Sequence, residues 1–193
     1  MTKPHDSVIK LIASVVAALL FIVVSAYFYV ESRRRPYEVP TTVGWQTGDI
    51  FFSVGNSWKS EFVRLSGGNA DEISHCGIVL RSGDKVVLVH MSTDKGHIVG
   101  ESPDDYGKIN NASKVIVRHL TNPVDTISLK KRLECLLSSG KPFDYKFDKT
   151  DTAEYYCSEL VVDLMFADST REYKSLMRHD YIYPQDIYNI LNF

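Results

Sequence analysis

The longest hydrophobic stretch of the chain lies near its N-terminus. No charged residue interrupts the run Leu11–Val30, which ends in a cluster of aromatic residues at 27–29. About 20 apolar residues in a helix span the hydrocarbon core of a bilayer, and aromatic rings favour its interface. The pattern therefore predicts a transmembrane anchor over residues 11–30, preceded by a short N-terminal segment over residues 1–10.

A cleaved signal peptide is the alternative interpretation of this region. Lys3 and Lys10 precede the apolar run, and residues 24–26 (Val-Ser-Ala) are small enough to form a cleavage site. The run is longer than the 7–15 apolar residues that are typical of a signal peptide. This length favours an anchor that stays on the chain.

The pattern changes twice after the anchor. Residues 31–43 contain three consecutive arginines and two prolines without helical or strand periodicity, which is typical of a short stalk. Residues 44–193 alternate apolar and polar positions at strand and helix periods, and their number suits one domain with one core.

The order of strand-like and helix-like patterns indicates the fold class of this domain. Alternation predicts strands over residues 49–53, 73–80, 85–91, 97–99 and 114–120, and helical spacing predicts helices over 57–65, 125–139, 157–166 and 184–191. The second and third strands form a hairpin across the turn at residues 81–84. Strands grouped apart from helices predict an α+β fold, with an antiparallel sheet packed against helices.

Charge and cysteine content exclude some classes of function. The 22 basic and 24 acidic side chains leave a net charge near -2, so the chain lacks the basic surface that binding of nucleic acid requires. Three cysteines cannot all pair, which leaves at least one free thiol and no complete disulfide framework.

Cys157 is the free thiol with the most suggestive position. It begins an apolar stripe at helical spacing, Cys157, Leu160, Val161 and Leu164, so it lies at a helix N-terminus and faces inward. The positive end of a helix dipole favours the thiolate, which is the nucleophilic form of cysteine. A small buried side chain without chemistry is the plainer alternative.

Two histidines of the hairpin could serve such a thiolate. A turn at Ser82-Gly83 places His75 directly opposite His90, and a turn at Gly83-Asp84 makes them diagonal neighbours on the same face. A three-residue loop would turn His90 to the other face.

A nucleophile, a base and a group that orients the base are the three parts of a catalytic triad. Cys157, His75 and His90 supply one candidate for each part, in that order. The same three residue types could bind zinc, but their spacing does not favour a metal site. We expect no cofactor.

The other candidates have structural interpretations. Cys76 points to the opposite strand face from His75 and belongs to the core, and Cys135 lies in a helix without a partner. Glu159 lies in the first turn of the cysteine helix, where a carboxylate suits the helix dipole.

Five motifs resemble one known family. They are Trp45-Gln-Thr-Gly-Asp-Ile-Phe-Phe, Ser74-His-Cys-Gly-Ile-Val, Gly140-Lys-Pro-Phe-Asp-Tyr, Tyr155-Tyr-Cys-Ser-Glu-Leu and Tyr183-Pro-Gln-Asp. Together they resemble the permuted papain-like amidases of the YiiX/YaeF type, which are circularly permuted relatives of NlpC-type cysteine peptidases. The resemblance covers residues 44–193.

This resemblance implies a permuted papain-like fold with the base, His75, ahead of the nucleophile, Cys157. It also implies a third polar residue on the strand after the base, often Glu, at the position of His90. Many NlpC-type relatives have Tyr where this chain has Phe143, and Tyr145 or Tyr156 could substitute for it.

The activity implied is cleavage of an amide bond in a peptide or peptidoglycan fragment through an acyl-enzyme. Two alternatives remain: a hydrolase or acyltransferase acting on a lipid ester or thioester with the same triad, and a non-catalytic binding module at the membrane.

The side of the membrane is predicted from opposing signals. Two lysines precede the anchor and three arginines follow it, so the positive-inside rule leans toward a cytoplasmic domain by one charge. The likeness of the N-terminus to an export signal, and the export of relatives, favour the other side. We expect an anchor in a bacterial inner membrane that holds the domain on the periplasmic face.

Overall fold

The computed structural model describes residues 4–32, 34–67, 72–120, 124–151, 153–166 and 170–191, and it divides into two units, Met1–Arg35 and Pro36–Phe193. The first unit contains helix α1, Pro4–Ser32. Its segment Val8–Tyr29 is long and apolar enough to cross a membrane. The helix begins at Pro4, so the segment expected before the anchor is helical from that residue on.

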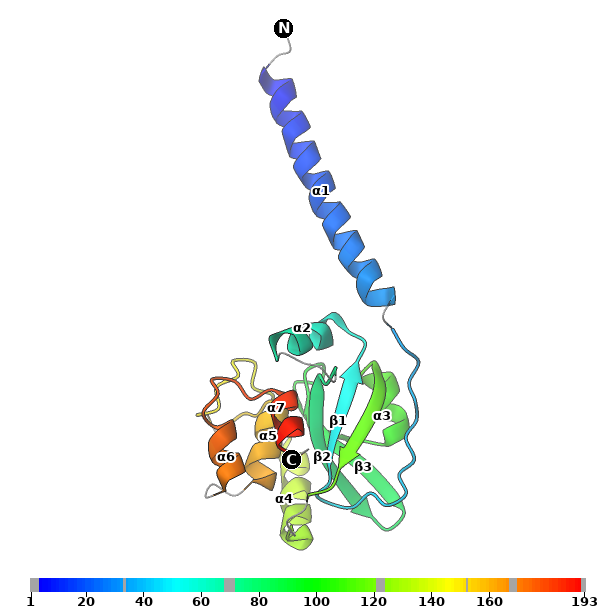
Figure 1. Cartoon of the computed structure of the whole chain (residues 1–193), viewed down its shortest axis with the longest axis vertical. Coiled ribbons are helices and arrows are strands. Elements are labelled where there is room, and N and C mark those ends of the chain that lie inside the picture. The colour runs from blue at the N-terminus through cyan, green and yellow to red at the C-terminus, as the bar shows by residue number, and fades with distance from the viewer. Residues whose placement is uncertain are drawn as a thin grey trace. The chain divides into compact units, whose positions relative to one another are not determined.

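The second unit is built around a five-stranded sheet (Figure 1). Its strands are β1 Ile50–Gly55, β2 His75–Ser82, β3 Lys85–Ser92, β4 His97–Glu101 and β5 Ala112–Arg118. The order across the sheet is β4-β3-β2-β1-β5, and every neighbouring pair is antiparallel. The predicted α+β class with an antiparallel sheet is confirmed.

The hairpin of β2 and β3 has the second of the two expected registers. Ser82 pairs with Lys85, so Gly83 and Asp84 form the turn, and Gly83 has a φ of 62° that glycine adopts without strain. His75 and His90 are therefore diagonal neighbours on one face of the sheet.

Helices cover the sheet unequally. They are α2 Trp58–Ser66, α3 Pro103–Ile109, α4 Thr126–Ser139, α5 Cys157–Met165, α6 Arg171–Leu176 and α7 Pro184–Ile190. Helices α4 to α7 gather on one side of the sheet and α3 lies on the other (Figure 1). The sequence did not predict α3 or α6, which have seven and six residues and so show little periodicity.

Alternation along the strands produces two cores. Ile50 and Phe52 of β1 pack in the larger core with α4, α5, α6 and α7, whereas Phe51 packs on the other face with Tyr106 of α3. Both cores contain completely buried side chains. Because close-packed interiors deform little, the sheet is a rigid support for the residues on it.

The start of the second unit runs along the sheet edge. The Tyr37 hydroxyl donates to the Pro103 carbonyl at 2.6 Å, and the Glu38 N–H donates to the carbonyl of Ser113 in edge strand β5 at 2.9 Å. Contacts with the domain therefore begin within the segment that the sequence predicts as a stalk.

Candidate active site

Helix α5 positions the cysteine. Cys157 is its first residue, and Leu160 and Val161 are fully buried in the larger core, so the helix is fixed against the sheet. The thiol itself is half-buried, whereas Cys76 of β2 is completely buried beneath it. The inward position at a helix start that the sequence predicts is thus observed.

The surroundings of Cys157 stabilise its thiolate. A hydrogen bond from the Cys76 thiol, and the charge and hydrogen bond of the His75 ring, lower the pKa of Cys157 well below the ordinary value, although burial opposes them. Burial, followed by the neighbouring Cys157, raises the pKa of Cys76. The Ser158 hydroxyl lies 3.7 Å from Cys76 Sγ and 3.8 Å from Cys157 Sγ. Of the two thiols, Cys157 is therefore the one whose thiolate the surroundings stabilise.

His75 and His90 contact each other directly. His75 Nε2 lies 3.0 Å from His90 Nδ1, and the rings meet edge to face at 89°. The structure thus brings together all three residues that the sequence singled out, because the ring of His75 lies against the Cys157 thiol on its other side.

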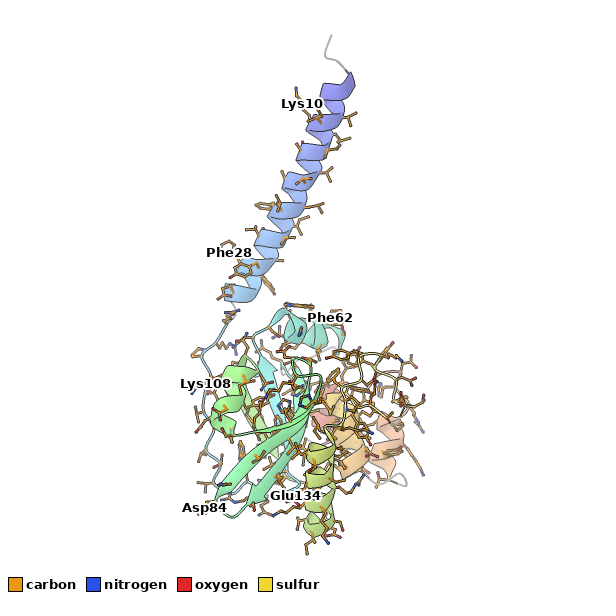
Figure 2. The ribbon with its side chains drawn as sticks, turned by 180° about the vertical axis from the view of Figure 1, so that it is seen from behind. Lys10, Phe28, Phe62, Asp84, Lys108 and Glu134 are labelled. Carbon is orange, nitrogen blue, oxygen red and sulfur yellow. The ribbon has the colours of Figure 1, made fainter. Side chains whose placement is uncertain are left out.

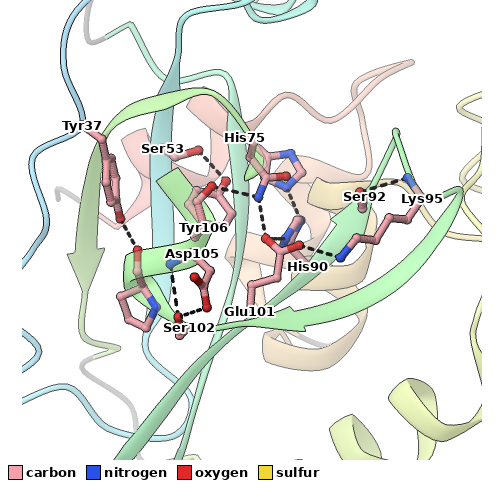
Figure 3. A network of polar contacts seen from close by, with 12 residues as sticks. Tyr37, Ser53, His75, His90, Ser92, Lys95, Glu101, Ser102, Asp105 and Tyr106 are labelled. Carbon is pink, nitrogen blue, oxygen red and sulfur yellow. Dashed lines mark hydrogen bonds and ion pairs between the residues drawn. The ribbon is translucent and has the colours of Figure 1, made fainter. Parts of the chain in front are cut away.

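Glu101 extends this chain of contacts and was missed from the sequence. The carboxylate, at the end of β4, lies 3.4 Å from His90 Nε2 and accepts a hydrogen bond from Lys95 Nζ at 3.0 Å (Figure 3). It also accepts a hydrogen bond from the Asn110 side chain. Burial alone would raise the pKa of Glu101, but these three donors outweigh it and lower the pKa to about 2. The group is therefore a buried carboxylate at neutral pH.

The ionised carboxylate fixes the tautomers of both histidines. Because Glu101 can only accept, His90 Nε2 carries a proton and His90 Nδ1 is an acceptor. His75 Nε2 must then donate to His90, which leaves His75 Nδ1 to exchange a proton with Cys157. The arrangement aims one nitrogen of His75 at the thiol.

Packing holds His90 in this orientation. Its side chain is completely buried, and the rings of Tyr106 and Phe51 contact it edge to face at centroid distances of 5.1 Å and 6.2 Å. Burial, followed by repulsion from His75, lowers the pKa of His90, so its ring is neutral. Gly77 lies on the same face of β2 as His75. A larger residue does not fit there, because an added Cβ would lie 2.4 Å from the Val89 carbonyl oxygen.

Two of the three residues open into a cleft of about 310 Å³, whereas His90 is completely buried. Cys157 and His75 line it together with Trp58, Phe143 and Phe147. Tyr106, whose hydroxyl contacts Ser53 Oγ at 2.8 Å, also borders it. This volume lies at the lower end of the range that is typical of clefts for small molecules.

Neither candidate substitute for the missing tyrosine hydroxyl is directed at the cleft. Phe143 lines it, but the Tyr145 hydroxyl donates to the Thr93 carbonyl, and the Tyr156 hydroxyl accepts from the Ile182 N–H. The tyrosine that does line the cleft is Tyr106, from the unpredicted helix α3.

Of the two remaining candidates, Glu159 has a structural role and Cys135 lies on the surface. The Glu159 carboxylate accepts from the Tyr156 N–H at 3.4 Å and so closes the first turn of α5. Burial and then the nearby Asp144 and Asp163 raise the pKa of Glu159 to about 8. Cys135 is exposed on α4.

The alternative of a metal site needs a third ligand beside the histidine pair, because a structural or catalytic zinc ion has at least three protein ligands. In the described part of the chain, no three His, Cys, Asp or Glu side chains are grouped so that they could hold one.

The fold and the site define an α+β protein with a cysteine at a helix start, facing a histidine pair on an antiparallel sheet. The crystal structure of metalloprotein YiiX from Escherichia coli O157:H7 (DUF1105) is similar, with a TM-score of 0.56 and 19% identity. The similarity covers 75% of this chain and 92% of that one. The likeness to the YiiX type is thus confirmed at the level of the fold. No family model and no curated protein matches the chain.

Proposed function

We propose that this chain is a cysteine hydrolase that accepts an acyl group on Cys157 and passes it to water. The observation that carries the proposal is the chain of contacts from Glu101 through His90 to His75, beside a half-buried thiol whose pKa is lowered. Buried polar chains of this kind orient a catalytic base and fix its tautomer.

The proposed reaction begins with the thiol proton on His75 Nδ1. Cys157 Sγ attacks the carbonyl carbon, and the Cys157 N–H at the start of α5 stabilises the oxyanion. The leaving amine or alcohol takes the proton from His75. Water, deprotonated by His75, then attacks the thioester and releases the acid.

The family resemblance places an amide in a peptide or peptidoglycan fragment first among the substrates. A lipid ester or thioester is the alternative, and a non-catalytic module at the membrane is the third candidate. His75 in β2 precedes Cys157 in α5, an order that supports a circularly permuted papain-like arrangement. The apolar helix α1 is long enough for the proposed single-pass anchor. The proposed position of the domain on the periplasmic face rests on the sequence of the N-terminus alone.

The proposal is tested by trapping the acyl-enzyme. Full-length protein is mixed with amide, ester and thioester substrates, and the mass of the peptide that contains Cys157 is measured. We expect an acyl adduct that hydroxylamine removes, present in Cys135→Ser and absent in Cys157→Ala, with the melting temperature of both variants within about 3 °C of the wild type. Absence of an adduct on Cys157 with every substrate would favour the binding module.

A further inference from the structure

Helix α2 exposes large apolar side chains that the fold does not use. Trp58, Phe62 and Leu65 are 68%, 67% and 73% exposed. Their spacing places them on one face of the helix, which we call the α2 stripe. Figure 2 shows Phe62 on the outer side of α2, away from the sheet. A contiguous exposed patch of this kind marks an interaction surface.

The α2 stripe lies beside the candidate active site. Strand β1 ends at Gly55, Ser57 caps α2, and β2 begins at His75, so α2 is connected at the end of the sheet where the histidine lies. Trp58 lines the same cleft as His75 and Cys157. Whatever covers the α2 stripe is therefore adjacent to the cleft.

The chain from α1 enters the domain at the same end. Glu38 pairs with Ser113 at the start of β5, and the neighbouring Asn111 carbonyl accepts from the Asn56 N–H, one residue before the cap of α2. Residues 33–36 join α1 to Tyr37, and a segment of that length reaches at most about 18 Å. A bilayer that holds α1 is thus within reach of this end.

We propose that the α2 stripe docks onto the bilayer that holds α1, and that the adjacent cleft takes its acyl group from a lipid of that bilayer. The second part rests on the proposed hydrolase function, whereas the docking does not. Indole and other apolar side chains on one face of a helix partition into the membrane interface. A bilayer is favoured over a soluble partner because the anchor keeps it permanently within reach of the α2 stripe.

The apolar rim of the cleft suits an acyl chain. Ile109 and Phe147 line the cleft and are 48% and 43% exposed, in addition to Trp58. In the proposed step, Cys157 Sγ forms a bond to the carbonyl carbon of the lipid as the bond to its head-group oxygen or nitrogen breaks. His75 supplies the proton to that leaving group, and water later releases the fatty acid.

Docking is tested by the fluorescence of Trp58. The chain has two tryptophans, and Trp45 is buried. Full-length Trp45→Phe, which keeps Trp58, and Trp58→Phe, which keeps Trp45, are reconstituted in phosphatidylcholine vesicles with plain or brominated acyl chains. We expect bromine to reduce Trp58 emission by about half or more and to leave Trp45 emission unchanged. Comparison of the wild type with Trp58→Phe gives the same answer if Trp45→Phe does not fold.

Equal Trp58 emission in the two kinds of vesicle would overturn the docking. A blue shift of Trp58 that needs no lipid and grows with protein concentration in detergent would assign the α2 stripe to a second copy of the chain, which also overturns it. Both outcomes are independent of whether Cys157 is reactive.

The lipid substrate is tested with two esters. Phe62→Ser/Leu65→Ser should hydrolyse p-nitrophenyl palmitate in phosphatidylcholine vesicles about tenfold more slowly than the wild type, and p-nitrophenyl acetate in solution equally fast. Ile127→Ser is the matched control, since Ile127 is 70% exposed beside the hairpin turn at Gly83. Equal loss on both esters would overturn the lipid proposal. Activity of the wild type on neither ester would contradict the proposed function itself, and the fluorescence result would still decide the docking.

Discussion

The side chains beneath the cleft and those on α2 beside it differ in polarity and in exposure to solvent. His90 and Glu101 are polar, buried and fully bonded, whereas Trp58, Phe62 and Leu65 are apolar and exposed. Burial of charged and imidazole groups costs free energy, whereas burial of hydrocarbon side chains does not. Exposure of a stripe of apolar groups is also unfavourable in water. Both regions depart from what stability alone selects. In the proposed function the first positions a reactive group, and in the proposed docking the second meets the bilayer.

The largest expected effect separates the two histidines. His75→Ala should lower kcat by about a thousandfold, because it removes the group that moves the proton, and His90→Ala by about tenfold to a hundredfold, because it removes only the orientation. Single-turnover kinetics on any ester that forms the acyl-enzyme measure both. A His90→Ala enzyme that equals the wild type would contradict the contact chain.

The next largest effect on kcat is expected from a change at the Glu101 carboxylate. Glu101→Gln keeps the size of the side chain but offers His90 Nε2 a group that can donate, so the tautomers of both histidines are no longer fixed. We expect kcat to fall by about tenfold or more with little change in KM. A rise in KM alone would instead assign Glu101 to substrate binding.

A smaller effect is a pH-dependent change in stability at Glu159. Because the folded state raises the pKa of this carboxyl from 4.5 to about 8, its contribution to stability is fully present below pH 4.5 and is lost as the pH rises to 8. Glu159→Gln keeps the cap on Tyr156 without the charge. Its melting temperature should match the wild type at pH 4 and exceed it by a few degrees at pH 8. A difference that does not change with pH would contradict the raised pKa.

The smallest expected effect lies in the α2 stripe. Leu65→Ala should change the free energy of unfolding by less than about 0.5 kcal/mol, because the side chain is exposed. Leu160→Ala, the same change at a fully buried position of α5, should cost about 2–5 kcal/mol. Urea denaturation of both variants tests the contrast, and a comparable loss at Leu65 would show that the α2 stripe is part of the core.

The sequence predicted the sheet and the pairing of His75 with His90 because these depend on local patterns. Alternating residues set the faces of β2 and β3, and the short turn at Gly83-Asp84 left few registers. The family resemblance independently placed His75 and Cys157 in the same roles.

The contacts of Glu101 with His90 and of Cys76 with Cys157 could not be predicted from local sequence patterns. A strand over residues 97–99 stops before Glu101, and only its continuation beside β3 places that carboxylate near His90. Cys76 was correctly assigned to the core, but its contact with Cys157 depends on where α5 lies on the sheet, which no spacing within either segment encodes.

The most direct test of the central claim is the pH dependence of Cys157 alkylation. In a Cys135→Ser background, iodoacetamide modification of the Cys157 peptide is followed by mass spectrometry. The account predicts that the rate persists at a lower pH than for an ordinary thiol, with a pKa near 8.5, and that His75→Ala shifts the profile toward that of the ordinary thiol. An ordinary profile that His75→Ala leaves unchanged would contradict it.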